Sequence, residues 1–151
     1  TYVSDATSND VLLSIEQMKK ETDSLISDFA GRLTTHLTGQ KLRMAPHPFW
    51  NSPSFLFNLP DNLVMLFEQA RLAIFKGDLN YRRMVKDAVL PPTLSFSEVA
   101  EYFPTSALML RCLKSDPIVG LPSGKAEQLD TIDSEWRTNG KRGIIQLHRA
   151  Q

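Results

Sequence analysis

The segment GLPSGK at residues 120–125 is the part of the chain closest to a phosphate-binding loop. The nucleotide-binding version has four residues between its glycines and a Ser or Thr after its lysine, whose hydroxyl binds Mg²⁺. Here three residues separate Gly120 from Gly124, and Ala126 follows Lys125. The spacing therefore indicates a turn that leads into a helix, and we expect no nucleotide or other cofactor.

Three histidines are candidates for metal binding or acid–base catalysis: His36, His47 and His148. They lie on separate segments, and none has the His, Cys, Asp or Glu spacing of a metal site. His36 falls near a predicted helix end, where a protonated imidazole suits the negative end of the helix dipole. His47 stands between two prolines and beside two aromatic residues, so it either bonds within its loop or contacts a partner.

Cys112 is the only cysteine, which excludes an internal disulfide and a multi-cysteine metal site. It lies among apolar residues on the predicted buried face of a helix, where a reactive thiolate is disfavoured. One reduced cysteine favours an intracellular, reducing compartment. An organelle reached through a removed targeting peptide is the alternative location.

Acidic residues gather in the predicted last helix, and a carboxylate pair there would be a candidate for acid–base catalysis. The acids are Glu127, Asp130, Asp133 and Glu135. Such a run is typical of the solvated face of a helix. No serine has the sequence context of a nucleophile elbow. The sequence therefore predicts a non-catalytic protein with no evident small-molecule substrate.

Basic residues form two small clusters that are candidates for nucleic-acid contact. They are Arg82, Arg83 and Lys86 in one helix, and Lys141 and Arg142 in the tail. Nucleic-acid binding favours a dense basic stripe, whereas the whole chain has 17 basic and 17 acidic residues and no net charge. A small nucleic-acid-associated helical domain is thus an alternative function, and an enzyme whose site is not legible from the sequence is another.

Hydrophobic periodicity predicts an all-α fold of about six helices in one domain. The hydrophobic fraction of 42% is that of a globular protein, and no window reaches the ~18 apolar residues that a membrane span needs. Residues 1–44 contain one long amphipathic helix, residues 61–139 a helical core, and residues 140–151 a basic tail. Within the tail, residues 143–148 form either a short strand or an apolar anchor.

The long first helix is expected over residues 10–37. Its apolar residues alternate steps of four and three, as in coiled coils. The stripe consists of Val11, Ile15, Met18, Leu25 and Phe29, with Thr22 at its one polar position. A second helix, over residues 61–76, is apolar on nearly every side and should be central. Ser95 and Glu98 form a capping-box pattern, which predicts a short helix there.

Prolines and aromatic residues are concentrated in residues 45–60, which we expect to be extended and to lie on an apolar surface. Together with the first helix, this segment favours a protein-interaction subunit or adaptor of a larger assembly, with a protein partner or a second copy of the chain. The contact candidates are Val11, Ile15, Met18, Leu25, Phe29, His47, Phe49, Trp50, Phe55 and Phe57.

Overall fold

The computed structural model describes residues 6–150 and divides the chain into two compact units, one ending at Pro53 and the other beginning at Ser54. The described part holds six α-helices and a three-stranded sheet, so the chain is α/β and the prediction of an all-α fold is wrong. All three strands belong to the second unit.

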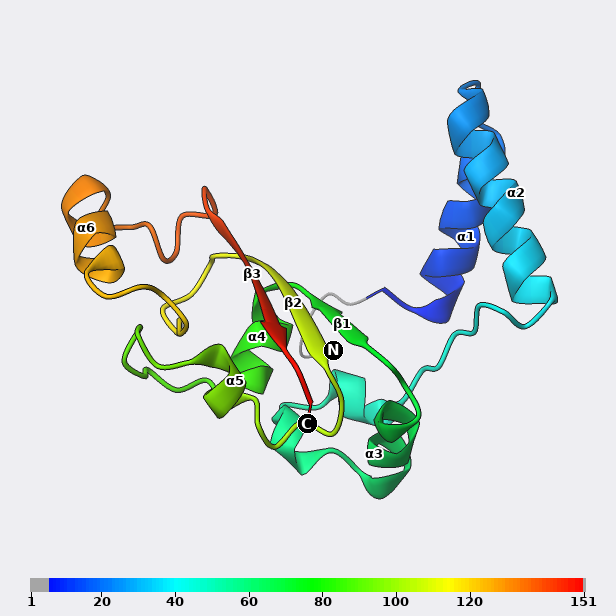
Figure 1. Cartoon of the computed structure of the whole chain (residues 1–151). Helices are drawn as coiled ribbons and strands as arrows, with labels where there is room; N and C mark the ends of the chain where they lie inside the picture. Colours follow the sequence, from blue (N-terminus) through cyan, green and yellow to red (C-terminus); the bar gives the residue numbers. More distant parts are fainter. Residues whose placement is uncertain (1–5, 151) are drawn as a thin grey trace. The chain divides into compact units, whose positions relative to one another are not determined.

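The first unit is a helical hairpin (Figure 1) formed by α1 (Ser8–Met18) and α2 (Ser24–Thr38). The predicted single helix over residues 10–37 is wrong, because the chain turns between these two segments. The Asp23 carboxylate accepts a hydrogen bond from the Leu25 amide at 2.8 Å and starts a new helix. The turn leaves Ile15 and Ala30 buried, one on each helix.

The proline and aromatic segment is less extended than predicted. It contains two 3₁₀-helices, η1 (Pro48–Asn51) in the first unit and η2 (Leu56–Asn58) in the second. The His47 imidazole accepts a hydrogen bond from the Phe49 amide at 3.1 Å and caps η1. Proline at the first helical position favours such a turn, because its fixed φ is already that of a helix.

The predicted helix over residues 61–76 is also wrong, since only its first half is helical. The helical part is α3 (Asp61–Glu68). Residues Ala73–Lys76 form strand β1 instead of continuing the helix. Burial alternates along this strand: Phe75 is buried whereas Ile74 is 61% exposed. Alternation with a period of two is the pattern of a strand with one covered face.

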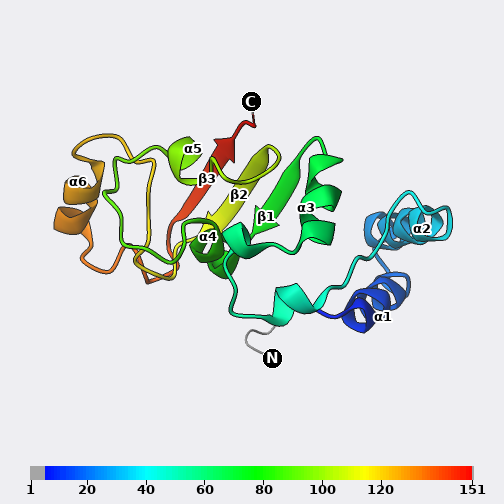
Figure 2. The same ribbon diagram turned by 90° about the horizontal axis from the view of Figure 1, so that it is seen from below.

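Strands β2 (Ala107–Cys112) and β3 (Gly143–His148) complete the sheet. Its order is β1-β2-β3, with β1 parallel to β2 and β3 antiparallel to β2, as Figure 2 shows. The segment that carries Cys112, predicted to be a helix, is therefore a strand. Of the two alternatives for residues 143–148, the strand is confirmed, and its partner is β2.

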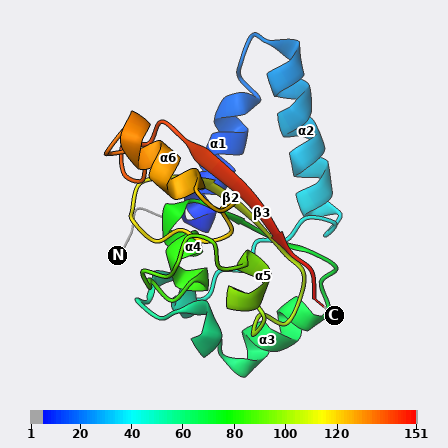
Figure 3. The same ribbon diagram turned by 60° about the vertical axis from the view of Figure 1, so that its left-hand side comes forward.

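Three further helices join the strands: α4 (Asp78–Met84), α5 (Phe96–Val99) and α6 (Lys125–Ile132). Helices α4 and α5 lie on one side of the sheet (Figure 3), over its buried side chains. These include Phe75 and Met109, which are 7% and 0% exposed. The capping box of Ser95 and Glu98 is confirmed at the start of α5.

Gly77 connects β1 to α4 with φ 109° and ψ 159°, a backbone conformation that only glycine adopts without strain. A Cβ there would meet no atom within 4 Å, so the cost of a side chain is purely conformational. We expect Gly77→Ala to lower the free energy of unfolding by about 1–3 kcal/mol in urea denaturation.

Gly31 is the matched control for this prediction. It also has open space around a built Cβ, but it lies inside α2. Gly31→Ala should be neutral or stabilising, because alanine is the better helix former. Equal effects of the two substitutions would contradict the conformational argument.

Candidate active site

A pocket of about 580 Å³ lies at the carboxyl ends of β1 and β2. In parallel sheets the strand ends and the loops that follow them are the usual place for ligands. The volume is within the ~300–1,000 Å³ common for small-molecule sites. Its lining residues are Lys76, Gly77, Asp78, Leu110, Arg111, Cys112, Lys114, Gly143, Ile144 and Ile145.

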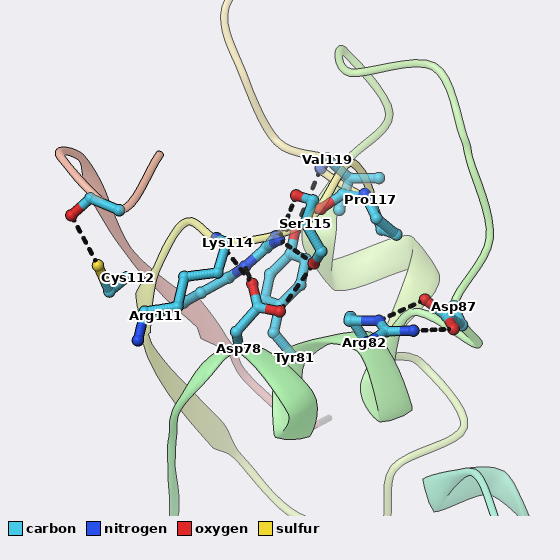
Figure 4. A network of polar contacts seen from close by, with 11 residues as sticks. Asp78, Tyr81, Arg82, Asp87, Arg111, Cys112, Lys114, Ser115, Pro117 and Val119 are labelled. Atoms are coloured by element: carbon cyan, nitrogen blue, oxygen red, sulfur yellow. Dashed lines mark hydrogen bonds and ion pairs between the residues drawn. The ribbon is translucent and has the colours of Figure 1, made fainter. Parts of the chain in front are cut away.

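Asp78 follows β1 and is the centre of a polar network (Figure 4). Its Oδ1 accepts hydrogen bonds from Arg111 Nε at 2.8 Å and from the Lys114 amide at 3.2 Å. Its Oδ2 accepts from the Ser115 hydroxyl at 2.8 Å. One carboxylate thus ties the end of β1 to the loop that follows β2.

Arg111 lies in β2, and its side chain is completely buried. Besides Asp78, its guanidinium donates to the carbonyls of Pro117 and Ser115 and to the Ser115 hydroxyl. It also stacks on Tyr81, with Cζ 4.2 Å from the ring centroid. A buried guanidinium requires such a set of partners, because an unpaired charge in the interior is very unfavourable.

Tyr81 of α4 is hydrogen-bonded to the same loop. Its hydroxyl oxygen accepts a hydrogen bond from the Val119 amide at 3.1 Å. The side chain is fully buried, and burial raises the pKa of its phenol, so Tyr81 is neutral near pH 7. Its role in this network is structural, since the hydroxyl is committed to the loop backbone.

A small apolar core holds the other side of this loop. Trp136 is 1% exposed and packs with Leu113, Ile118 and Ala126. Two of these residues flank Lys114 and Ser115 in the sequence, so the loop is anchored at both ends. The indole Nε1 donates to Asp130 at 2.7 Å, which satisfies the one polar atom of the Trp136 side chain.

Two lysines remain available to a ligand. Lys76 and Lys114 line the pocket and are exposed, and within residues 6–150 their amines make no hydrogen bond or ion pair. The lining contains three cationic side chains and one carboxylate, and that carboxylate is already paired with Arg111. The pocket is therefore suited to an anion, next to an apolar wall of Leu110 and Ile145.

Cys112 is the last residue of β2 and is exposed, in contrast to the predicted buried helix face. Its Sγ lies 3.1 Å from the Gly140 carbonyl oxygen. In the described part of the chain no group of three or more His, Cys, Asp or Glu could hold a metal ion. Nor does any helix there have the length and apolar character to span a membrane.

The predicted partner-contact residues stay predictions, and the structure places them in both units. In the first, Leu25 and Phe29 are 78% and 45% exposed, whereas Ile15 is buried. Phe49 is buried and meets Trp50 edge-on, with ring centroids 5.2 Å apart. The remaining members are exposed or half-buried: Val11, Met18, His47, Phe55 and Phe57.

The basic residues proposed for nucleic acid stay predictions, and most of them have partners within the chain. Arg82 pairs with Asp87, and Arg83 is buried and donates to the Ser54 carbonyl at 2.8 Å. Lys86 lies over the rings of Phe57 and Tyr102. In the tail, Arg142 pairs with Asp133, and Lys141 is exposed.

Sequence reasoning missed Asp78, Arg111 and Lys114, although a signal was present. Asp78 follows a short apolar run at residues 73–75, after Lys76 and Gly77, and Lys114 directly follows the mostly apolar run at residues 107–113. If these runs are read as parallel strands, their polar successors meet at one edge of the sheet. Because the sequence analysis predicts helices for these runs, it does not predict that their polar successors meet.

Residues 1–129 match the family model of the damage-control phosphatase ARMT1-like domain, which is most of the chain. The chain belongs to this family. Relatives named damage-control phosphatase ARMT1 include those of Xenopus laevis, 33% identical over 150 residues, and Danio rerio, 33% identical over 157 residues. The human relative is 32% identical over 149 residues.

These alignments cover 96–99% of the chain but 34–35% of each relative, so the chain spans about a third of the length of the curated relatives it matches. Membership of the ARMT1-like family overturns the prediction of a non-catalytic interaction subunit or adaptor, and with it the prediction that the chain is no enzyme. The prediction of no evident small-molecule substrate is contradicted as well, because the matched family is described as a phosphatase-like domain.

Proposed function

We propose that the chain carries the phosphate-binding part of a phosphatase active site, which accepts the phosphate ester of a small molecule. One observation carries this proposal: two lysines that have no ion-pair partner in the described part of the chain lie at the carboxyl ends of β1 and β2, in a pocket of about 580 Å³. Membership of a phosphatase family supports the same assignment.

Lys114 and Lys76 bind the phosphate oxygens in this proposal. An ammonium group offers three donors and a full charge, and it stabilises the negative charge of a phosphoryl group during transfer. Asp78 holds the Lys114 backbone, so the lysine meets the phosphate from a fixed position. The apolar wall of Leu110 and Ile145 accommodates the organic part of the ester.

Replacing Lys114 with alanine tests this proposal. We expect Lys114→Ala to weaken the binding of inorganic phosphate by about tenfold to a hundredfold, the loss of one charge-assisted hydrogen bond. Binding is measured by calorimetry or by ³¹P NMR. Hydrolysis of p-nitrophenyl phosphate, if the wild-type chain catalyses it, should fall in parallel.

Lys125→Ala is the matched control. Lys125 is the lysine of the glycine-rich segment, lies at the start of α6 and donates to Gln128 at 2.9 Å. It is absent from the lining of the candidate pocket. Its loss should leave phosphate binding unchanged; a larger effect at Lys125 than at Lys114 would place the anion at the glycine-rich segment instead.

A further inference from the structure

Arg111 is the residue of this site whose role is least obvious. An arginine beside a phosphate pocket would ordinarily be assigned to the phosphate, because its planar fork matches the oxygens of that group. Yet the side chain is 0% exposed, although residue Arg111 contributes to the pocket wall. Its guanidinium is therefore turned into the protein.

Four hydrogen bonds already use most of the five N–H donors of this guanidinium. One goes to Asp78, one to the Pro117 carbonyl and two to Ser115. One face lies on the Tyr81 ring. A phosphate could displace these bonds only by leaving buried carbonyls and a carboxylate unpaired, which is costly.

The charge of Arg111 is also balanced within the network. Asp78 Oδ1 lies 2.8 Å from its Nε, so the pair presents no net charge to a ligand. What the pair does is to hold the loop that follows β2, because Asp78 also accepts from the Lys114 amide and the Ser115 hydroxyl. Within residues 6–150 the Lys114 amine makes no hydrogen bond or ion pair, so Lys114 is the group that the network presents to a ligand.

From these contacts we infer that Arg111 is a positioning residue: it does not contact the phosphate, and with Asp78 it fixes the loop that presents Lys114. This inference rests on the proposed function for the place of the phosphate. It predicts that replacing the planar guanidinium of Arg111 weakens phosphate binding even if a positive charge is kept at residue 111.

The first test uses the unaltered chain and inorganic phosphate. Titration is followed by NMR on the Arg111 Nε–Hε signal and on the lysine side-chain signals. The Arg111 signal should keep its position and its slow exchange with water, while the Lys114 signal shifts. A shift of the Arg111 signal as large as that of Lys114 would overturn the inference.

The second test replaces Arg111 with lysine, which keeps the charge and loses the planar fork. We expect Arg111→Lys to increase the hydrogen exchange of residues 113–119 and to weaken phosphate binding by about tenfold or more, as the loss of an orienting partner does. Wild-type affinity in Arg111→Lys would show that charge alone matters and would overturn the inference.

Arg137→Lys is the control. Arg137 forms an ion pair with Asp130, and its Cζ lies 4.3 Å from the centroid of the Trp136 ring. Like Arg111 it thus has an acidic partner and an aromatic contact, but it is not among the residues that line the pocket. This variant should keep both loop protection and phosphate affinity. If the wild-type chain binds no phosphate, the proposed function fails, whereas unchanged exchange of the loop in Arg111→Lys would refute the positioning role separately.

Discussion

Replacing Trp136 with alanine is expected to lower the free energy of unfolding of the second unit by about 3–5 kcal/mol, the usual cost of removing a buried aromatic ring. The ring is 1% exposed and forms the centre of the small core with Leu113 and Ile118. Urea denaturation followed by circular dichroism measures the loss, because the substitution removes a fluorophore.

The same substitution should loosen the loop that carries Lys114. Leu113 and Ile118 flank this loop and pack on Trp136, so hydrogen exchange of residues 113–119 should rise in Trp136→Ala. Trp136→Phe is the control: it keeps most of the packing and loses the 2.7 Å bond to Asp130, so its effect should be clearly smaller. Similar losses for alanine and phenylalanine would contradict a packing role for the ring.

The second large effect on the free energy of unfolding is expected when the Asp78 carboxylate is removed. Asp78→Ala leaves the fully buried Arg111 guanidinium without its counter-charge, and breaking such a pair costs about 3–5 kcal/mol. The loss should appear as a lower urea midpoint. Phosphate binding should weaken as well, because the Lys114 amide loses its acceptor.

Two comparisons make this prediction specific. Asp87→Asn breaks the ion pair with Arg82, where both side chains are about a third exposed, and should cost no more than about 1 kcal/mol. The double variant Asp78→Ala, Arg111→Met should recover part of the stability, since it leaves no buried charge unpaired. A double variant less stable than Asp78→Ala would contradict this account.

Local signals in the sequence predicted helix ends better than they predicted the sheet. The capping box at Ser95, the start of α6 at Lys125 and the start of α3 after Pro60 depend on side chains close in sequence, and all three are present. Such caps act within one turn of helix, so a single segment is enough to recognise them.

Strands β1 and β2 were missed because their identity depends on partners far along the chain. Ala73–Lys76 continues an apolar run that also fits a helix, and a short buried strand cannot be separated from a helix by periodicity alone. In β2, Ala107, Leu108 and Met109 individually favour helices, but pairing with β1 and β3 overrides that preference. The site was missed with the strands, since its residues meet only once the sheet is formed.

The pairing of the sheet also has a consequence for the order of folding. Ala73 pairs with Ala107, and Ala107 with His148, so each closure brings together residues far apart in the sequence, whereas α1 and α2 are joined by a short turn. Contacts of high sequence separation form slowly, because a long loop loses its entropy before they are made. The helical hairpin should therefore acquire its structure early during refolding, and the phosphate pocket should be among the last features to appear.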